Sequence, residues 1–127
     1  MREFRPPFGI KLYVPEVVLY IIIPKLKSVN CESIPSLIKE WQKQGILSRD
    51  VRKRLQITAE WDLKEPEWEC KFSRECGFNE YRVYYNRRKR KYYLVYIRLE
   101  REYPGVYHPG AYMAYVAGMY LIKPKYH

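Results

Sequence analysis

Two stretches of the sequence, residues 80–85 and 91–99, adjoin a run of five cations from Arg87 to Lys91. Apolar and polar residues alternate in both stretches with a period of two. This is typical of β-strands, because successive side chains point to opposite faces of a sheet. A short polar run between two such stretches is typical of a tight connection. We therefore expect a β-hairpin with a strongly basic tip at residues 86–91.

The alternation also predicts which side chains of this hairpin share a face. If the loop holds an odd number of residues, the face that carries Tyr85 aligns with the face that carries Tyr93, and together they form the core side. The opposite face then presents Arg82, Tyr84, Tyr92, Leu94, Tyr96 and Arg98. Rings that alternate with cations on an open sheet face suit single-stranded nucleic acid, because bases stack on the rings while cations follow the phosphates.

This hairpin is the leading candidate for a functional site. Residues 81–98 hold seven cations and no acid, and they include six of the fourteen tyrosines. We expect phosphate contacts from Arg87, Arg88, Lys89, Arg90 and Lys91, stacking by Tyr84, Tyr92 and Tyr96, and assistance from Arg82 and Arg98. A basic hairpin would equally enter a duplex groove or lie along its backbone, so the sequence leaves DNA, RNA and strand state open. The alternative is a solvated, charged turn beside tyrosines that cover a sheet edge.

The composition supports one domain with a polyanionic partner. The chain has 127 residues, with 24 Lys and Arg against 14 Asp and Glu, and a formal net charge of +10. That length is enough to bury a core without metal or disulfide staples, and an aromatic content of 17% excludes global disorder. A positive net charge favours association with polyanions and does not specify a fold. Three Asn and three Gln beside abundant Lys, Ile and Tyr resemble the proteins of thermophilic archaea and their viruses.

The apolar segments indicate a protein without a membrane partner. The longest uncharged apolar run, residues 17–23, is far shorter than the roughly 20 residues that a spanning helix needs. The first eleven residues carry no secretory signal pattern. We therefore expect a cytoplasmic protein, located in the host cell if it is viral. The sequence leaves a homo-oligomer open.

Other segments predict an α+β domain over residues 1–127 whose sheet is mainly antiparallel. Two prolines make residues 1–9 an extended arm, and residues 10–14 read as a strand. Residues 17–23 are β-branched and apolar on both faces, which predicts a central, doubly buried strand. A further strand is open at residues 57–61.

Three helices are expected to pack against this sheet. Residues 33–44 carry an apolar stripe at helical spacing, and residues 48–55 follow as a short helix that begins at Ser48. The pair has the length of a helix-turn-helix, but a plain αα-hairpin fits better, with Arg49, Arg52 and Lys53 as a secondary basic face. Small residues at four-residue spacing predict a helix over 109–122, although alternation from 112 to 120 leaves a strand open.

Signals for catalysis or bound metal are weak. Glu69-Cys70-Lys71 has the Glu-x-Lys form of metal-dependent nucleases, with Asp62 upstream as a second ligand. Tripeptides of that form are common by chance. The sequence also allows a zinc site of Cys31, Cys70, Cys76 and His108, but the spacing of these residues is untypical, and a Cys70–Cys76 disulfide is a further option. We therefore expect no catalytic residues, no metal and no cofactor.

The sequence thus favours a non-catalytic nucleic-acid-binding protein. A structural or assembly protein, such as a subunit of a thermophilic archaeal virus, is the main alternative. Its support comes from the small-residue C-terminal segment, the exposed tyrosines and the apolar run at 17–23. A nuclease built on residues 69–71 is third.

Overall fold

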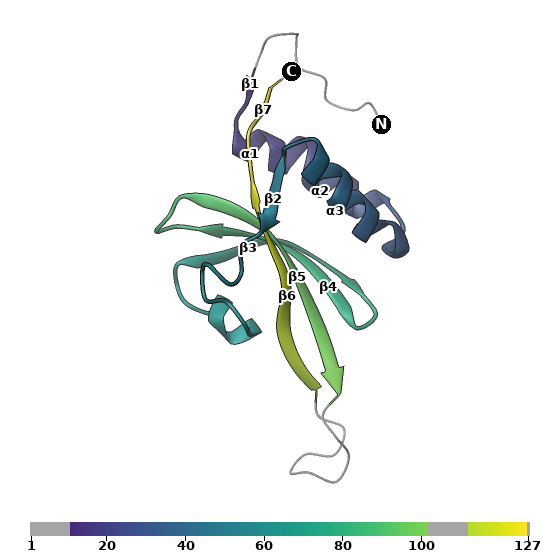
Figure 1. Cartoon of the computed structure of the whole chain (residues 1–127), viewed down its shortest axis with the longest axis vertical. Coiled ribbons are helices and arrows are strands. Elements are labelled where there is room, and N and C mark those ends of the chain that lie inside the picture. Colours follow the sequence, from purple (N-terminus) through teal and green to yellow (C-terminus); the bar gives the residue numbers. More distant parts are fainter. Residues whose placement is uncertain (1–10, 102–111, 127) are drawn as a thin grey trace.

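Five antiparallel strands form the central sheet, in the order β2-β6-β5-β4-β3. The computed structural model describes residues 11–101 and 112–126 (Figure 1). The strands are β2 (Leu47–Asp50), β3 (Trp68–Cys76), β4 (Asn79–Asn86), β5 (Lys91–Arg101) and β6 (Tyr112–Ile122). The predicted α+β class with a mainly antiparallel sheet is confirmed, whereas several of the individual elements differ from expectation.

The strands β4 and β5 pair through a four-residue connection, residues 87–90. Tyr85 lies opposite Tyr92, and Tyr84 lies opposite Tyr93. Directly opposed residues point to the same face of a sheet. The predicted alignment, which needed an odd loop and placed Tyr85 with Tyr93, is therefore wrong. An even loop shifts the pairing by one residue, and a shift of one moves a side chain to the other face.

A layer of helices covers one face of the sheet (Figure 1). It contains α1 (Val14–Val17), a π-helical segment (Val18–Ile22), α2 (Ile23–Ser28) and α3 (Ile34–Lys43). The helix predicted for 33–44 is confirmed by α3, which buries Ile34, Ile38 and Trp41.

The strand predicted for residues 17–23 is wrong, because this segment is helical. Of the prolines that flank it, Pro15 stands in the first turn of α1, where a missing N–H costs little, and Pro24 directly follows the π-helical segment. Val17, Val18 and Ile22 face the core, whereas Leu19 and Tyr20 remain exposed. The continuous apolar run therefore reflects an apolar outer surface on a helix and not a strand that is buried on both sides.

Residues 51–67 cover the opposite face of the sheet with little regular structure. The helix predicted for 48–55 is wrong: its first residues form β2, which pairs with β6. The oxygens expected to cap a helix bond to β6 instead, since Ser48 Oγ accepts the Leu121 N–H and Asp50 Oδ1 accepts the Met119 N–H. The predicted strand at 57–61 reduces to one bridge, between Ala59 and Tyr115, followed by a 3-10 turn at Glu60–Leu63.

The C-terminal helix predicted for 109–122 is wrong over the residues that the structure describes, where β6 is an eleven-residue strand. One of these small residues, Gly118, leaves room for the side chain of Tyr120 and not for a helix. A Cβ atom on Gly118 would lie 2.7 Å from the Tyr120 hydroxyl oxygen. Residues 109–111, His108 and the arm at 1–9 lie outside the described residues.

A separate two-stranded ribbon joins the two ends of the described chain. It consists of β1 (Lys11–Leu12) and β7 (Lys125–Tyr126), so the strand predicted for 10–14 is limited to two residues where it is described. Across residues 11–101 and 112–126, no helix has the length and apolar character needed to cross a membrane.

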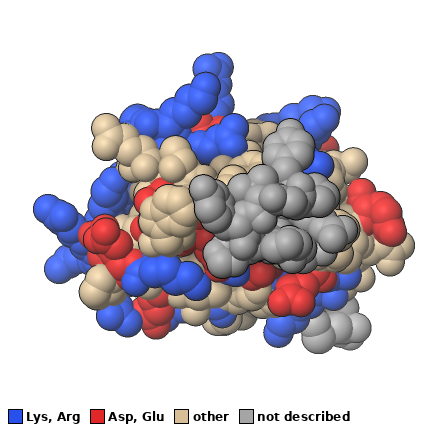
Figure 2. Space-filling model, turned by 90° about the horizontal axis from the view of Figure 1, so that it is seen from below, with Lys and Arg blue, Asp and Glu red and all other residues tan. Residues whose placement is uncertain are grey.

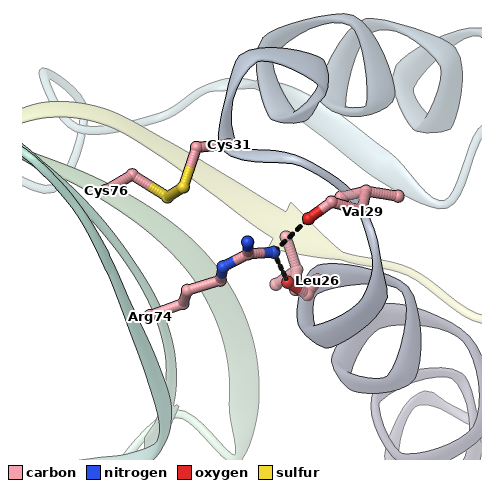
Figure 3. The surroundings of a disulfide bond; sticks show 5 residues. All are labelled: Leu26, Val29, Cys31, Arg74 and Cys76. Carbon is pink, nitrogen blue, oxygen red and sulfur yellow. Dashed lines mark hydrogen bonds between the residues drawn. A yellow bond between two sulfur atoms is a disulfide. The ribbon is translucent and has the colours of Figure 1, made fainter.

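A disulfide between Cys31 and Cys76 ties the helical layer to the end of β3 (Figure 3). Close by, Arg74 Nη1 donates to the carbonyl oxygens of Leu26, at 2.5 Å, and Val29, which satisfies acceptors at the end of α2. The predicted option of a Cys70–Cys76 bridge is wrong, and a Cys₃His zinc site is incompatible with this disulfide.

Candidate functional site

The β4–β5 turn has a backbone that is fixed from both sides. The Asn86 side chain is buried, and its Oδ1 accepts the Lys89 N–H at 2.8 Å. The Arg90 N–H donates to the Asn86 carbonyl at 2.8 Å, and the Arg87 N–H donates to the Glu67 carbonyl at the same distance. These bonds hold the loop against the segment that covers the sheet and give its side chains a defined platform.

The cations of this turn differ in how far they are neutralised. Arg87 Nε lies 3.2 Å from Glu69 Oε2, and Arg88 Nη1 lies 4.0 Å from Glu67 Oε2, with the Arg88 side chain 83% exposed. Lys89, Arg90 and Lys91 are exposed and have no carboxylate partner in the described part of the chain. Figure 2 shows basic side chains projecting at the left edge, where the turn lies in Figure 1, with acidic ones beside them.

A tyrosine pair lies next to the turn, on the sheet face that the helices partly cover. The rings of Tyr85 and Tyr92 are 4.7 Å apart and tilted by 44°, and both side chains are half-buried. Glu69 occupies the same row of β3 and contacts two cations, since Lys71 Nζ lies 2.7 Å from Glu69 Oε1 and Arg87 approaches Oε2. Hydrogen bonds from these two cations lower the pKa of Glu69.

Sequence reasoning missed Tyr85 and Lys71 as neighbours of this turn. Tyr85 had been placed on the core side, and correct counting of the loop would have paired it with Tyr92. Lys71 had been considered only as part of a nuclease motif. No sequence signal pointed to its place, because a bulge between Cys70 and Phe72 shifts the register of β3 there.

Two of the predicted contact residues lie under the cover of residues 51–67. Tyr84 is 4% exposed, and its ring packs edge-on against Trp68 at 6.1 Å. The Arg82 side chain is 14% exposed and binds Glu80, Glu60 at 3.0 Å and the Tyr84 hydroxyl at 2.9 Å. The predicted open face for Tyr84 and Arg82 is therefore wrong, because residues 51–67 pack on it.

The arginine at the centre of this network stays charged despite its burial. Burial lowers the pKa of Arg82, but hydrogen bonds with Glu80, Tyr84 and Glu60 outweigh it and raise that pKa above its usual value. The Glu80 carboxylate accepts hydrogen bonds from Arg82 and from the Ser73 hydroxyl, and these bonds lower the pKa of Glu80. Arg82 thus acts as a structural cation that joins β4 to the 3-10 turn at Glu60–Leu63.

The structure separates the remaining predicted residues from the turn. Tyr96 is half-buried, stacks on Tyr81 with ring centroids 5.1 Å apart and donates its hydroxyl to Asn79 Oδ1 at 2.8 Å. Arg98 is exposed but stands opposite Asn79, seven residues along β5 from Lys91 and therefore roughly 23 Å away. Both residues lie along β5 at a distance from the basic turn.

The secondary basic face predicted at residues 49–53 does not form a helix face. Arg52 is bound to Asp50 at 3.1 Å and to the Val116 carbonyl at 3.0 Å. Arg49 and Lys53 are exposed, but they stand on a strand and on a turn that follows it. Of these three basic residues, Arg52 attaches residues 51–67 to β6.

The predicted nuclease residues are engaged with other groups. Both oxygens of Glu69 contact cations, and Asp62 Oδ2 accepts the N–H groups of Thr58 and Ala59 at 2.8 and 2.9 Å. Those two backbone hydrogen bonds lower the pKa of Asp62. Within residues 11–101 and 112–126, no three His, Cys, Asp or Glu side chains gather as metal ligands would.

The chain matches no protein-family model, no curated protein and no solved structure. Function must therefore be inferred from the side chains of the chain itself.

Proposed function

We propose that this protein binds nucleic acid without catalysis, through phosphate contacts from the cations of the β4–β5 turn. One observation carries the proposal. Four consecutive cations, Arg88 to Lys91, are exposed on a turn whose backbone is fixed, and among the described residues a carboxylate approaches only the first of them, at 4.0 Å. A cluster of unneutralised positive charge on a rigid projection attracts a polyanion and loses little conformational freedom on binding.

The backbone of Arg90 supports this interpretation. Its φ angle is +56°, in the left-handed region that costs a non-glycine residue roughly 1–2 kcal/mol. Glycine would close the same turn without that cost. Strained backbone positions are concentrated at functional sites, where the surrounding structure maintains them. An arginine at this position extends the cationic run where a turn alone would favour glycine.

The tyrosines that we propose for stacking are Tyr85 and Tyr92, in place of the expected Tyr84, Tyr92 and Tyr96. Tyr84 and Tyr96 are engaged within the protein, whereas Tyr85 and Tyr92 lie beside the turn and are only half-buried. Tyr92 was expected to stack and Tyr85 was not, and their pair lies one residue from the paired Asn86 and Lys91, within reach of a strand bound at Lys91. Phosphate contacts therefore supply most of the affinity, and contact with this pair is an addition.

Two variants of equal charge test the proposal. Lys89→Gln/Lys91→Gln removes two cations from the turn, and Lys25→Gln/Arg98→Gln removes two exposed cations elsewhere. Binding of 20-nucleotide DNA and RNA, single- and double-stranded, is measured by filter retention between 50 and 200 mM salt. Each lost phosphate contact lowers the slope of log affinity against log salt by about 0.7–0.9. The turn variant should lose about 1.5 in slope, whereas the control keeps the wild-type slope.

Equal behaviour of the two variants would overturn the assignment to this turn. Oligomerisation of the wild-type protein without retention of any nucleic acid would favour the assembly alternative. Thermal unfolding of both variants provides the folding control, since all four substituted side chains are exposed.

A further inference from the structure

A second basic surface lies where α3, β2 and the end of β6 meet. It is a shallow, open depression of about 530 Å³. Its lining includes four cations and no acid: Lys39, Lys43, Arg49 and Lys123. All four are exposed, and within the described residues none of their side chains has a hydrogen bond or an ion pair.

The floor of this depression is held by local hydrogen bonds. Gly45 follows the C-cap of α3 and has a φ of +79°, a conformation that favours glycine. The Lys123 N–H donates to the Ile46 carbonyl at 2.9 Å, and Gln42 Nε2 donates to the Ser48 carbonyl at 3.0 Å. The backbone that carries the cations is therefore fixed before any ligand binds.

The acidic residues closest in sequence do not neutralise these cations. Glu40 Oε1 accepts a hydrogen bond from Gln44 Nε2 at 3.4 Å. Asp50 binds Arg52 and the Met119 N–H. The positive charge of the four cations is therefore available to attract an anion into the depression. An anion with several charged oxygens would have a cation on each side there.

The depression and the basic turn lie at the same end of the sheet. Tyr93 on β5 pairs with Leu121 on β6. Lys91 precedes Tyr93 by two residues, and Lys123 follows Leu121 by two. With paired Cα atoms about 5.5 Å apart and about 3.4 Å per residue, the Cα atoms of Lys91 and Lys123 are separated by at most about 20 Å.

We propose that this depression is a second phosphate-binding site for the nucleic acid that the β4–β5 turn binds. This inference rests on the proposed function. Phosphates follow one another by about 3.4 Å along each strand of a duplex, so six steps are enough to cover the separation of the two sites. One backbone crosses the end of the sheet from the turn to the depression, and neither site binds a separate ligand.

Substitution of two lining cations tests this inference. Lys43→Gln/Lys123→Gln removes charge from the depression and leaves the turn intact, with Lys25→Gln/Arg98→Gln again as the matched control. On a 20-base-pair duplex, the depression variant should lower the salt slope by about 1.8. Combined with the turn substitutions, it should lower the slope by about twice that amount, because the two sets of contacts add.

Amide chemical shifts supply a readout that distant electrostatics would not move. On addition of duplex to the wild-type protein, the amides of Gly45, Ser48 and Lys123 should shift together with those of residues 87–91. In the depression variant, the shifts at residues 87–91 should persist. This second measurement separates contact from a general loss of positive charge.

The failures of the two proposals are distinguishable. If the depression variant binds like the control while the turn variant loses affinity, the second site is overturned and the proposed function stands. Absence of shifts at Gly45 and Ser48 in a protein that binds duplex would also overturn the second site. If the wild-type protein retains no nucleic acid, both proposals fail.

Discussion

The two faces of the sheet are covered in different ways. Helices cover one face and are joined to β3 by the Cys31–Cys76 disulfide and by Arg74 at the end of α2. The other face is covered by residues 51–67, which have little regular structure. They are attached by the Arg82–Glu60 ion pair, by the hydrogen bond from Arg52 to the Val116 carbonyl, and by the burial of Leu63 against the sheet. One cover is joined to the sheet by a covalent bond, whereas the other is joined by noncovalent contacts, the Arg82–Glu60 ion pair among them, and is called the charge-dependent cover.

This difference matters for the basic turn because the turn contacts the charge-dependent cover. The Arg87 N–H donates to the Glu67 carbonyl, Arg87 Nη1 donates to the Pro66 carbonyl, and the Glu67 carboxylate approaches Arg88. Disturbing the helical face should therefore leave the turn unchanged, whereas loosening residues 51–67 should release it. The following experiments test that division, in order of decreasing effect on stability.

The largest effect is expected from removal of the disulfide. It closes a loop of 45 residues, and a cross-link of that span contributes about 4 kcal/mol to the free energy of unfolding by restricting the unfolded chain. Cys31→Ser/Cys76→Ser should lose about that amount in denaturant unfolding. Hydrogen exchange should rise in residues 14–46 and stay unchanged at residues 86–91.

Cys70→Ser is the matched control, because Cys70 is the free, exposed cysteine of the described residues. Its unfolding free energy should change by less than about 0.5 kcal/mol. Faster exchange at the β4–β5 turn in the double serine variant would break the proposed independence of the two faces.

The second effect comes from the buried cation. Arg82→Ala leaves the partly buried Glu80 without its cation and leaves Glu60 with the exposed Lys64 alone, and loss of one member of such a pair costs about 3 kcal/mol. Arg98→Ala, on the same hairpin but exposed, should cost less than about 0.5 kcal/mol. Exchange in the Arg82 variant should rise in residues 51–67 and at the turn, with the helical layer protected. A uniform rise over both faces would contradict the comparison.

Arg82 also shows where the sequence could predict the structure and where it could not. Period-two alternation and the polar run located β4, β5 and the basic turn, and the apolar stripe located α3. These are local signals within one element. Whether Arg82 faces solvent depends on residues 51–67, which lie far away in the sequence and have no periodicity that marks them as a cover.

The wrong elements have a related cause. Residues 17–23 have β-branched side chains, but packing of Val17 and Ile22 against the sheet decided their conformation in favour of helix. Ser48 and Asp50 carry the oxygens of helix caps, yet β6 offered N–H groups to the same oxygens. In both cases a tertiary partner, which is absent from any local window, competed with local preference and prevailed.

Acid should loosen the charge-dependent face before the helical one. Burial raises the pKa of Glu60, but hydrogen bonding and charge from Arg82 outweigh it and leave that pKa below the usual 4.5. The pKa of Glu80 is also lowered, chiefly by its hydrogen bond with Arg82. A carboxyl group whose pKa is depressed by folding contributes stability above its unfolded pKa, and this contribution is lost as pH falls through the folded value.

The unfolding free energy should therefore decline as pH falls below about 4.5, with early exchange in residues 51–67. Glu80→Gln should make this decline shallower, because a neutral amide does not titrate. An unchanged decline in that variant would show that other carboxylates govern the acid response.

The smallest effect on stability is expected at the turn itself and should have the opposite sign. Arg90→Gly relieves a left-handed residue, and the relief exceeds the entropy that glycine adds to the unfolded chain, so the free energy of unfolding should rise by about 0.5–1 kcal/mol. The same change removes one cation, which should lower the salt slope of duplex binding by about 0.9.

Arg88→Gly is the control for this separation of stability from binding. It makes the same chemical change two residues earlier, where φ is not positive, so glycine should lower stability by up to about 1 kcal/mol. Both variants lose one cation and should weaken binding equally, while their unfolding free energies move in opposite directions. If Arg90→Gly instead leaves duplex binding unchanged, the strained arginine has no role in contact, and the argument from its backbone conformation fails.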